Sequence, residues 1–528
     1  MGVLCDMGEQ IVLTQSDWSG GSYGIKDPHD SAPNEWTGLN VRRYYDGCIG
    51  PRPGLVKATK TGSTQNGRVW GLWYTAHVDN ELVAIIDNDM YVANFDNGVT
   101  DLDLSWASVG AMGAVPTSDI PFAHMLGTDI YLNSQSDGLY HFQPGGPTNT
   151  KITNPDGGEA LAFYGDRLYA GGRQTGSNPQ RVWYTDASDF NTVGASNYFD
   201  AGYTVAGRGF YHIRDNLKLA MGFGQWFSFN GTPSLGTLRV QHTREGVEHQ
   251  LSGVENEEQH VYYWGTSSQR GLLFTDGSTW DGLKYDHIRF TTGQSTRRGA
   301  FSYAFRDVLF TGQNVTTPEN PTACWWRAAE AFSYHEFGVA LLGPPARFGA
   351  ADFILSSKGD GSTTADFYFL SCSLNRPAST SDTRASPGDD AATQNFTCEL
   401  ETTLFHDPEG QLLRVKAVLV DCYAYDWDAS GGGDATLACK VKTWDRPVQA
   451  QPSGSATSQA GVAELAGTAQ TWTTDTSNVA TTGSNRRIVF GGEAVWGGAV
   501  SVRFTTIVGM KIKSVSVVCD REPVFGGP

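Results

Sequence analysis

Short apolar runs alternate with tight polar turns through the first two thirds of the chain. Leu82 to Ile86 is one such run, and Asn88-Asp89-Met90-Tyr91 follows it after one residue. Asp or Asn in a turn tolerates unusual backbone angles and can bond the backbone with its side chain. The apolar and aromatic residues that follow begin a new strand with alternate positions buried. The pattern therefore predicts an antiparallel hairpin here.

The same hairpin pattern recurs along the chain. Further copies are Thr128-Asp129-Ile130-Tyr131, Gly165-Asp166-Arg167-Leu168-Tyr169, Arg214-Asp215-Asn216-Leu217 and Arg306-Asp307-Val308-Leu309-Phe310. Later strands tend to end in Asp-Gly or Asn-Gly, as at Asp137-Gly138. Repeats of roughly 40–50 residues are typical of β-propellers. We expect an all-β fold with a propeller of about 6–7 blades in residues 58–375. An irregular array of β-sandwiches is the alternative.

The pattern changes after the repeats. Residues 376–395 contain Pro, Ser, Thr, Asp and Ala with little apolar content, which predicts a linker. In residues 396–528 the strands are longer, and Leu413, Val415, Ala417, Leu419 and Asp421 alternate with Arg414, Lys416, Val418 and Val420. Such a period of two is typical of half-buried strands, and we expect a β-sandwich there.

Helices are scarce by the same criteria. The one expected helix is short, from Ala323 to Phe332, and it follows Pro321. Its Trp325 and Trp326 are interpreted as core residues, because Trp is highly buried on average.

The N-terminal segment, residues 1–57, has a different pattern. It contains Ser19-Gly20-Gly21, Asp27-Pro28, Leu39-Asn40-Val41 and Arg52-Pro53-Gly54. This spacing of Gly and Pro predicts an extended arm with turns that ends in a sharp reversal.

Composition narrows the classes of function. The 528 residues carry a formal net charge of −18. This acidity argues against a sequence-specific nucleic-acid binder, which needs clustered Lys and Arg.

The eight cysteines form no C-x-x-C pair and are interpreted as mostly buried thiols, although pairing among Cys398, Cys422, Cys439 and Cys519 stays open. No stretch approaches about 18 consecutive apolar residues, so no membrane span is expected.

No catalytic constellation, cofactor motif or metal-ligand spacing is present among the common ones, and we expect neither an enzyme nor a cofactor. His335-Glu336 lacks a second His. Thr275-Asp276-Gly277-Ser278-Thr279-Trp280 is similar to the Asp-box of sialidases, one residue short, and is interpreted as a hairpin turn.

For two other groups of residues, a role in cleaving or binding carbohydrates is the alternative interpretation. Paired carboxylates could hydrolyse glycosides, but the two acidic groups lie in polar surroundings and are interpreted as solvated. An aromatic strip could stack on sugar rings, but such strips more often belong to a core or an interface. The acidic residues are Glu255, Glu257 and Glu258, with Asp101 and Asp103, and the strip is Trp70, Trp73 and Tyr74.

The N-terminal motifs, in their order, resemble the start of a family of bacteriophage tail proteins. Val182-Trp183-Tyr184-Thr185-Asp186 followed by Asp189-Phe190 is similar to a repeat element of the same family. Ser22-Tyr23-Gly24 departs from the family's usual Leu-Asn after the two glycines. The resemblance covers about half of the chain and implies a propeller in the tail nozzle or in minor tail proteins.

The resemblance implies a virion structural protein, assembled in the host cytoplasm into a homo-oligomeric, hexameric ring with other tail proteins. DNA would pass through an acidic lumen that repels it, and the arm would wrap a neighbouring subunit. A glycan-binding or glycan-degrading tail component is the alternative, and a secreted propeller lectin is a third possibility.

Overall fold

A computed structural model gives the fold. It describes residues 9–22, 31–52, 55–57, 59–62, 67, 69–75, 82–87, 89–95, 103–111, 122–135, 137–143, 148–173, 176–201, 207–214, 216–222, 225–228, 239–242, 246–247, 249–255, 259–264, 272–278, 280–282, 301–305, 308–312, 322–326, 331–335, 346–348, 352–356, 366–371, 381–384, 392–395, 398–424, 435–444, 463–466, 470–472 and 484–522. The fold is all-β, and the described residues include one 3-10 helix, η3 (Gln250–Ser252). No helix in the described part is long and apolar enough to cross a membrane.

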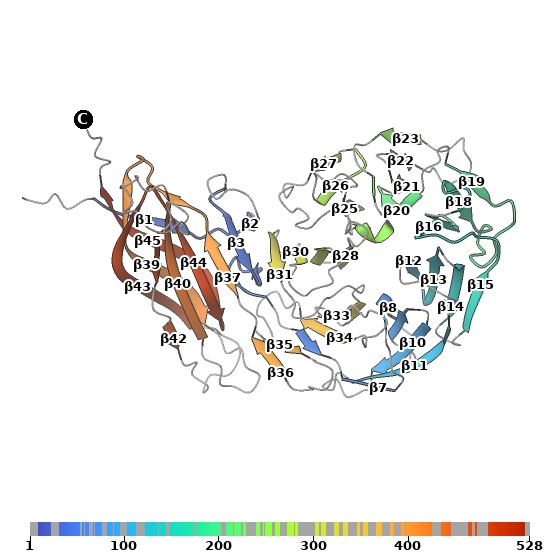
Figure 1. The fold of residues 1–528 in the computed structure, drawn as a ribbon, viewed down its shortest axis with the longest axis horizontal. Coiled ribbons are helices and arrows are strands. Elements are labelled where there is room, and N and C mark those ends of the chain that lie inside the picture. Colours follow the sequence, from blue (N-terminus) through green and yellow to red (C-terminus); the bar gives the residue numbers. More distant parts are fainter. Residues whose placement is uncertain are drawn as a thin grey trace, which may run out of the picture.

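Among the described residues, seven small sheets follow one another in the middle of the chain and form a propeller-like body (Figure 1). Most consist of four antiparallel strands in chain order, as short strands joined by tight turns require. The first four are β8 (Val69–Tyr74), β9 (Leu82–Ile86), β10 (Asp89–Phe95) and β11 (Asp103–Ala111); β12 (Phe122–Leu126), β13 (Asp129–Ser134), β14 (Gly138–Gln143) and β15 (Thr148–Ile152); β16 (Ala160–Tyr164), β17 (Arg167–Gly171), β18 (Arg181–Tyr184) and β19 (Tyr198–Asp200); and β20 (Gly207–Ile213), β21 (Asn216–Met221), β22 (Gln225–Ser228) and β23 (Arg239–His242). The last three are β24 (Gly253–Glu255), β25 (Val261–Trp264), β26 (Leu272–Thr275) and β27 (Trp280–Gly282); β28 (Phe301–Phe305), β29 (Val308–Gly312), β30 (Thr322–Trp326) and β31 (Ala331–His335); and β32 (Ala346–Phe348), β33 (Asp352–Ser356) and β34 (Phe367–Ser371).

The predicted hairpins are confirmed. Four copies of the repeat join the first two strands of a sheet, at β12–β13, β16–β17, β20–β21 and β28–β29. The copy that contains Asp89 joins β9 to β10, the second and third strands after β8. The first turn residue has a positive φ at Asp87 (48°), Gly127 (64°), Gly165 (61°) and Arg214 (48°). Such angles suit Gly and Asn or Asp and match the twist of the two strands. Arg214 adopts the same angle without that advantage, so the sheet geometry sets the turn there.

The N-terminal residues complete the first and last sheets. Strand β6 (Leu55–Lys57) pairs with β34 in the last sheet, and β7 (Thr59–Gly62) pairs with β11 in the first. Trp106 of the first sheet packs on Phe367 of the last, with ring centroids 4.8 Å apart. One short segment therefore crosses the seam between the two sheets, and their side chains share a core.

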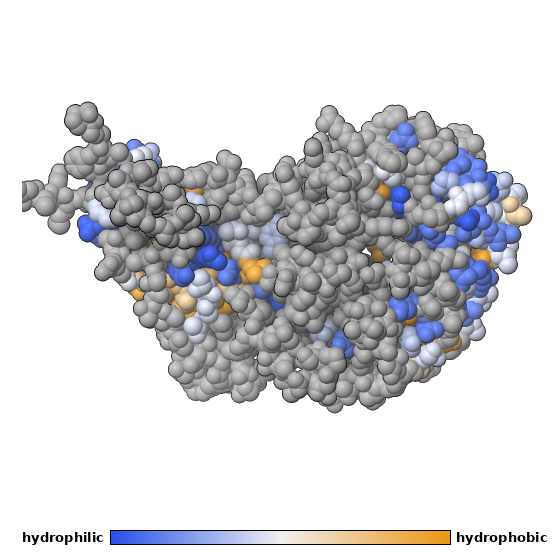
Figure 2. Space-filling model, in the orientation of Figure 1, coloured by the Kyte–Doolittle hydropathy of each residue, from blue (hydrophilic) through white to orange (hydrophobic). Residues whose placement is uncertain are grey.

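Neighbouring sheets pack face to face through buried side chains. Ile85 of the first sheet packs with Ile130 of the second, Tyr131 of the second with Leu161 of the third, and Tyr169 of the third with Phe210 of the fourth. The first strands of successive sheets lie side by side from β8 through β28, and β32 lies beside β8. These first strands are therefore the innermost ones. Figure 2 shows hydrophilic residues along the outer side, where β15, β18 and β19 lie.

The second body is a sandwich of two sheets that share one core. One sheet contains β4 (Val41–Arg43), β5 (Ile49–Pro51), β45 (Met510–Glu522), β39 (Leu412–Ala424) and β43 (Ser484–Gly497), with β1 (Gln10–Gln15) beside β45. The other contains β2 (Gly21–Ser22), β3 (Glu35–Leu39), β37 (Glu399–Thr402), β44 (Ala499–Val508), β40 (Ala435–Trp444) and β41 (Ala463–Ala466). In addition, β38 (Phe405–His406) pairs with β44, and β42 (Gln470–Trp472) pairs with β40. Trp36, Val418, Val502 and Val517 meet in the core.

The N-terminal segment differs from the expected arm. Its strands belong to both sheets of the sandwich, and Trp18 and Trp36 are fully buried in the shared core. Burying one such side chain removes about 150–250 Å² from water, worth on the order of 4–6 kcal/mol. The indole of Trp18 also donates to the carbonyl of Lys513 at 3.1 Å. A free arm would lose these contacts, and in this structure the segment packs within its own chain.

Two further expectations need correction. Residues 323–332 form no helix in the described part, because Trp325 lies in β30 opposite Phe332 of β31. The expected linker contains a hairpin of β35 (Ser381–Arg384) and β36 (Ala392–Asn395). In both places pairing between strands overrides the local composition.

Candidate functional site

Four innermost strands meet at a cluster of polar groups that we call the axial cluster: His124 of β12, Phe163 of β16, His212 of β20 and Glu255 of β24. The two ring nitrogens of His212 have different partners. Nε2 lies 2.6 Å from the Phe163 carbonyl oxygen, and Nδ1 lies 3.1 Å from the Glu255 carboxylate. The backbone N–H of His212 donates to the same carboxylate at 2.6 Å. The cluster thus connects neighbouring sheets through side chains.

The two histidines of the axial cluster have opposite pKa shifts. Burial lowers the pKa of His212, but the hydrogen bond and the charge of Glu255 outweigh it and raise the pKa above the usual value. Burial lowers the pKa of His124, whose Nδ1 lies 2.9 Å from the Met125 carbonyl oxygen. Its ring packs edge-on against Phe163, with centroids 5.3 Å apart.

The axial cluster is better suited to holding sheets together than to catalysis. Both oxygens of Glu255 lie within 3.1 Å of His212 Nδ1, and one also accepts the backbone bond, so the carboxylate is committed within the protein. A general acid or base must reach a substrate proton instead. No group of three or more His, Cys, Asp or Glu side chains in the described part could hold a metal ion.

A second set of residues forms what we call the joint: Asn40, Arg42 and Arg52 of the N-terminal segment, with Tyr334 and His335 of β31. The N–H of Asn40 donates to the Tyr334 carbonyl at 2.8 Å, which ties the sandwich to the sixth propeller-like sheet. Both arginines are fully buried, and the guanidinium of Arg42 lies 4.3 Å from the Tyr44 ring centre.

Electrostatics in the joint keeps His335 neutral. Burial, with Arg52 and Arg42 nearby, lowers the pKa of His335 well below its usual value. Its Nε2 lies 2.8 Å from Ser333 Oγ. The sequence interpretation of His335 as a structural residue agrees with this placement, and Glu336 lies outside the described residues.

The structure separates the acidic residues considered for glycoside hydrolysis. Glu255 belongs to the axial cluster, whereas Glu257 and Glu258 lie outside the described residues. Asp101 also lies outside them. Asp103 begins β11, but its side chain is not described. No carboxylate pair for hydrolysis is therefore formed by the described members.

The aromatic strip on β8 is mainly core. Trp70 is buried between the first and second sheets, and Trp73 packs against the same residues, while Tyr74 alone is exposed, at 42%. A sugar platform needs several exposed rings. Thr275 to Trp280 forms the turn between β26 and β27, as expected, with Ser278 Oγ donating to the Asp276 carboxylate at 2.9 Å.

The described cysteines agree with the interpretation of buried thiols. Cys48, Cys398, Cys422, Cys439 and Cys519 are free and buried. Burial raises the pKa of four of these thiols to about 12, namely Cys48, Cys422, Cys439 and Cys519. The pairing left open by the sequence does not occur among the four candidates.

Sequence reasoning missed both the axial cluster and the joint. His212 and Glu255 are 43 positions apart, and Asn40 and Tyr334 are much further apart still. The available signal was positional, since His212 stands two residues before a predicted turn, as does Phe163. Aligning the repeats by their turns would have brought these two positions together.

Comparisons with known proteins do not identify a family for this chain. No family model matches the chain, and no curated protein matches it in sequence. Solved structures with a similar arrangement include the computationally designed protein Ika8 (10% identity, 59% of this chain and 100% of that chain, TM-score 0.36). Others are YCF48 bound to D1 peptide (9% identity, 62% and 99%, TM-score 0.40) and BamB from Moraxella catarrhalis (11% identity, 61% and 91%, TM-score 0.36). At these scores the similarities carry no argument about function.

Proposed function

We propose that this chain is a structural subunit of a bacteriophage tail, in the nozzle or in a ring at the tail tip. The observation that carries the proposal is the joint. Asn40 and Arg52 are motif residues of the resemblance to phage tail proteins; Asn40 bonds Tyr334 of the propeller-like body, and Arg52 holds Asn40 in place. A segment that fixes two bodies together suits a part that must keep its shape under load.

The proposal includes a blade count and an assembly. We interpret the seven small sheets as seven blades, with β6 completing the last. Copies would form a homo-oligomeric ring, most simply with sixfold symmetry, and other tail proteins would bind its faces. Closed point-group symmetry is the usual arrangement of such oligomers.

The charge of the chain supports a DNA-conducting role without sequence-specific binding. A net charge of −18 opposes tight contact with phosphates. A ring of such subunits would repel DNA from its walls and let it pass. The protein would act in the virion after assembly in the host cytoplasm, with no chemistry of its own.

Electron microscopy of the purified full chain, together with sedimentation velocity, tests this proposal. We expect closed rings at micromolar concentration and no band shift of double-stranded DNA at physiological salt. A monomer that releases fragments from host surface polysaccharide would overturn the proposal and favour a glycan-degrading tail component. A monomer that binds the polysaccharide without cleaving it would favour a glycan-binding one.

A further inference from the structure

We infer that His212 is a protonated clasp that ties three neighbouring propeller-like sheets together around the axis and opens when its ring loses a proton. This inference concerns the propeller-like body alone and holds whether or not copies of the chain assemble.

Hydrogen-bond geometry requires the charged form of His212. Nε2 lies 2.6 Å from the Phe163 carbonyl, and Nδ1 lies 3.1 Å from each oxygen of the Glu255 carboxylate. A carbonyl and a carboxylate only accept hydrogen bonds, so both ring nitrogens must carry a hydrogen. A neutral imidazole has one N–H and would leave lone pairs facing each other at one of the two contacts.

The clasp spans three sheets because its partners come from three different first strands. Phe163 lies in β16, His212 in β20 and Glu255 in β24, on the third, fourth and fifth sheets. The same carboxylate also accepts the His212 backbone N–H at 2.6 Å. Loss of the ring proton therefore removes a bond to one neighbouring sheet and the charge attraction to the other.

Other titratable groups around His212 define the conditions under which the clasp is closed. Glu255 faces it from β24 and His124 from β12, and the Tyr164 ring of β16 has its centroid 6.1 Å away. Tyr211, on the same strand as His212, lies near Glu255. Glu257 and Glu258 lie outside the described residues. A second positive charge on His124 would oppose the charge on His212.

The directions of the two pKa shifts show on which side of the ordinary histidine value each ring titrates. The pKa of His212 is raised, so its stabilisation is complete below the unfolded value of about 6.5 and is lost as pH rises through the folded value. The pKa of His124 is lowered, so its contribution is present above about 6.5 and is lost as pH falls through the folded value.

Arg214 and Asp276 provide a matched control in the same part of the fold. Their side chains, 59% and 17% exposed, approach to 2.6 Å and join the fourth and fifth sheets. Arginine keeps its charge at every accessible pH. Arg214→Gln should therefore change stability by the same amount at all pH values above the titration of the carboxylate.

Hydrogen–deuterium exchange at the C2 position of each histidine, read by mass spectrometry on the full chain, tests the clasp directly. We expect His212 to titrate above about 6.5 and His124 below it. Glu255→Gln should lower the pKa of His212, because it removes the negative charge that favours the protonated ring. A His212 that titrates at or below the ordinary value in the unmodified protein would overturn the inference without any variant.

Urea unfolding from pH 6 to 9 provides the second readout. The folded-to-unfolded ratio of the unmodified protein should fall about tenfold for each unit by which the folded pKa of His212 exceeds the unfolded one. His212→Gln should remove this part of the pH dependence, whereas Arg214→Gln should keep it. The same slope in His212→Gln as in the unmodified protein would also overturn the inference.

Discussion

Arg52 and Asn40 hold each other in the joint through two hydrogen bonds. Arg52 Nε donates to Asn40 Oδ1 at 2.9 Å, and the Arg52 backbone N–H donates to the Asn40 carbonyl at 2.8 Å. The same carbonyl accepts the Cys398 thiol at 3.4 Å. Asn40 has a φ of 58°, which Asn tolerates better than most residues. The pair therefore fixes the turn that presents the Asn40 N–H to Tyr334.

Arg52→Gln should destabilise the joint by about 2–4 kcal/mol, because it removes a buried, hydrogen-bonded charge. Chemical denaturation followed by tryptophan fluorescence should then separate into two transitions, one for the sandwich and one for the propeller-like body. Arg487→Gln is the control, since Arg487 makes a similar pair with Asp421 on the surface. Equal effects of the two substitutions would contradict the role of the joint.

The side-chain amide of Gln250 in η3 bonds the backbone of β16 as a neighbouring strand would. Its Oε1 accepts the Leu161 N–H at 2.6 Å, and its Nε2 donates to the carbonyls of Leu161 and Phe210 at 2.8 and 3.1 Å. Gln250→Glu cannot donate these bonds when ionised, and the carboxylate would face two carbonyl oxygens.

We expect Gln250→Glu to lower the free energy of unfolding by about 2–4 kcal/mol, measured by urea denaturation at pH 7. Part of this loss should be recovered at pH 4, where the carboxyl group can hold a proton. The exposed Gln143, at the end of β14, gives the matched control Gln143→Glu. A loss of stability no greater than that of the control would mean that Gln250 does not bridge the sheets.

The hairpins could be predicted from the sequence because their causes are local. A turn residue such as Gly165 and the apolar residues on either side lie within one short segment. The joint and the axial cluster could not, because their members meet only after the sheets are in place. The helix expected around Trp325 was wrong for the same reason, since β29 and β31 hold that segment in a sheet.

The N-terminal segment shows the limit of the same reasoning. Its Gly and Pro spacing predicted an extended arm with turns, whereas the segment forms strands that pair within the sandwich. The expected reversal at Pro53-Gly54 lies outside the described residues. Trp18 lies against Lys513, and β1 pairs with β45, nearly 500 positions away. No local pattern specifies which sheet an isolated strand will join.

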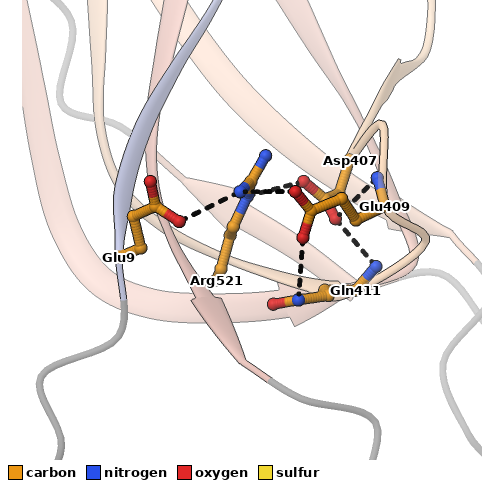
Figure 3. Close-up of polar contacts among 5 residues, drawn as sticks. All are labelled: Glu9, Asp407, Glu409, Gln411 and Arg521. Atoms are coloured by element: carbon orange, nitrogen blue, oxygen red, sulfur yellow. Dashed lines mark hydrogen bonds and ion pairs between the residues drawn. The ribbon is translucent and has the colours of Figure 1, made fainter.

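Arg521 of β45 links Glu9, next to β1, with Asp407 and Glu409 (Figure 3). Its guanidinium contacts Asp407 at 2.8 Å, Glu9 at 3.1 Å and Glu409 at 3.3 Å. Arg521→Gln should loosen β1 and leave the buried Asp407 without its cation. We expect faster amide exchange in residues 10–15, with Arg521→Lys intermediate because it keeps the charge but loses the fork of donors. Unchanged exchange in both variants would contradict this assignment.

Gly165 tests the turn that the repeat predicts. Its φ is 61°, and a Cβ built there would meet nothing within 4 Å, so only the backbone angle limits substitution. Gly165→Val should cost about 1–2 kcal/mol of strain, whereas Gly165→Asn should cost much less. Thermal unfolding of the two variants gives the comparison, and equal melting temperatures would rule out a left-handed backbone at this turn.

The most direct test of the proposed function is the position of this chain in intact phage particles made by cells that carry its gene. Gold-labelled antibody against the purified chain, viewed by electron microscopy, gives that position. The account predicts label at the end of the tail on most particles, with rings of the purified chain that match the tail's rotational symmetry. Label that stays with the cells, on particle-free material, would contradict it.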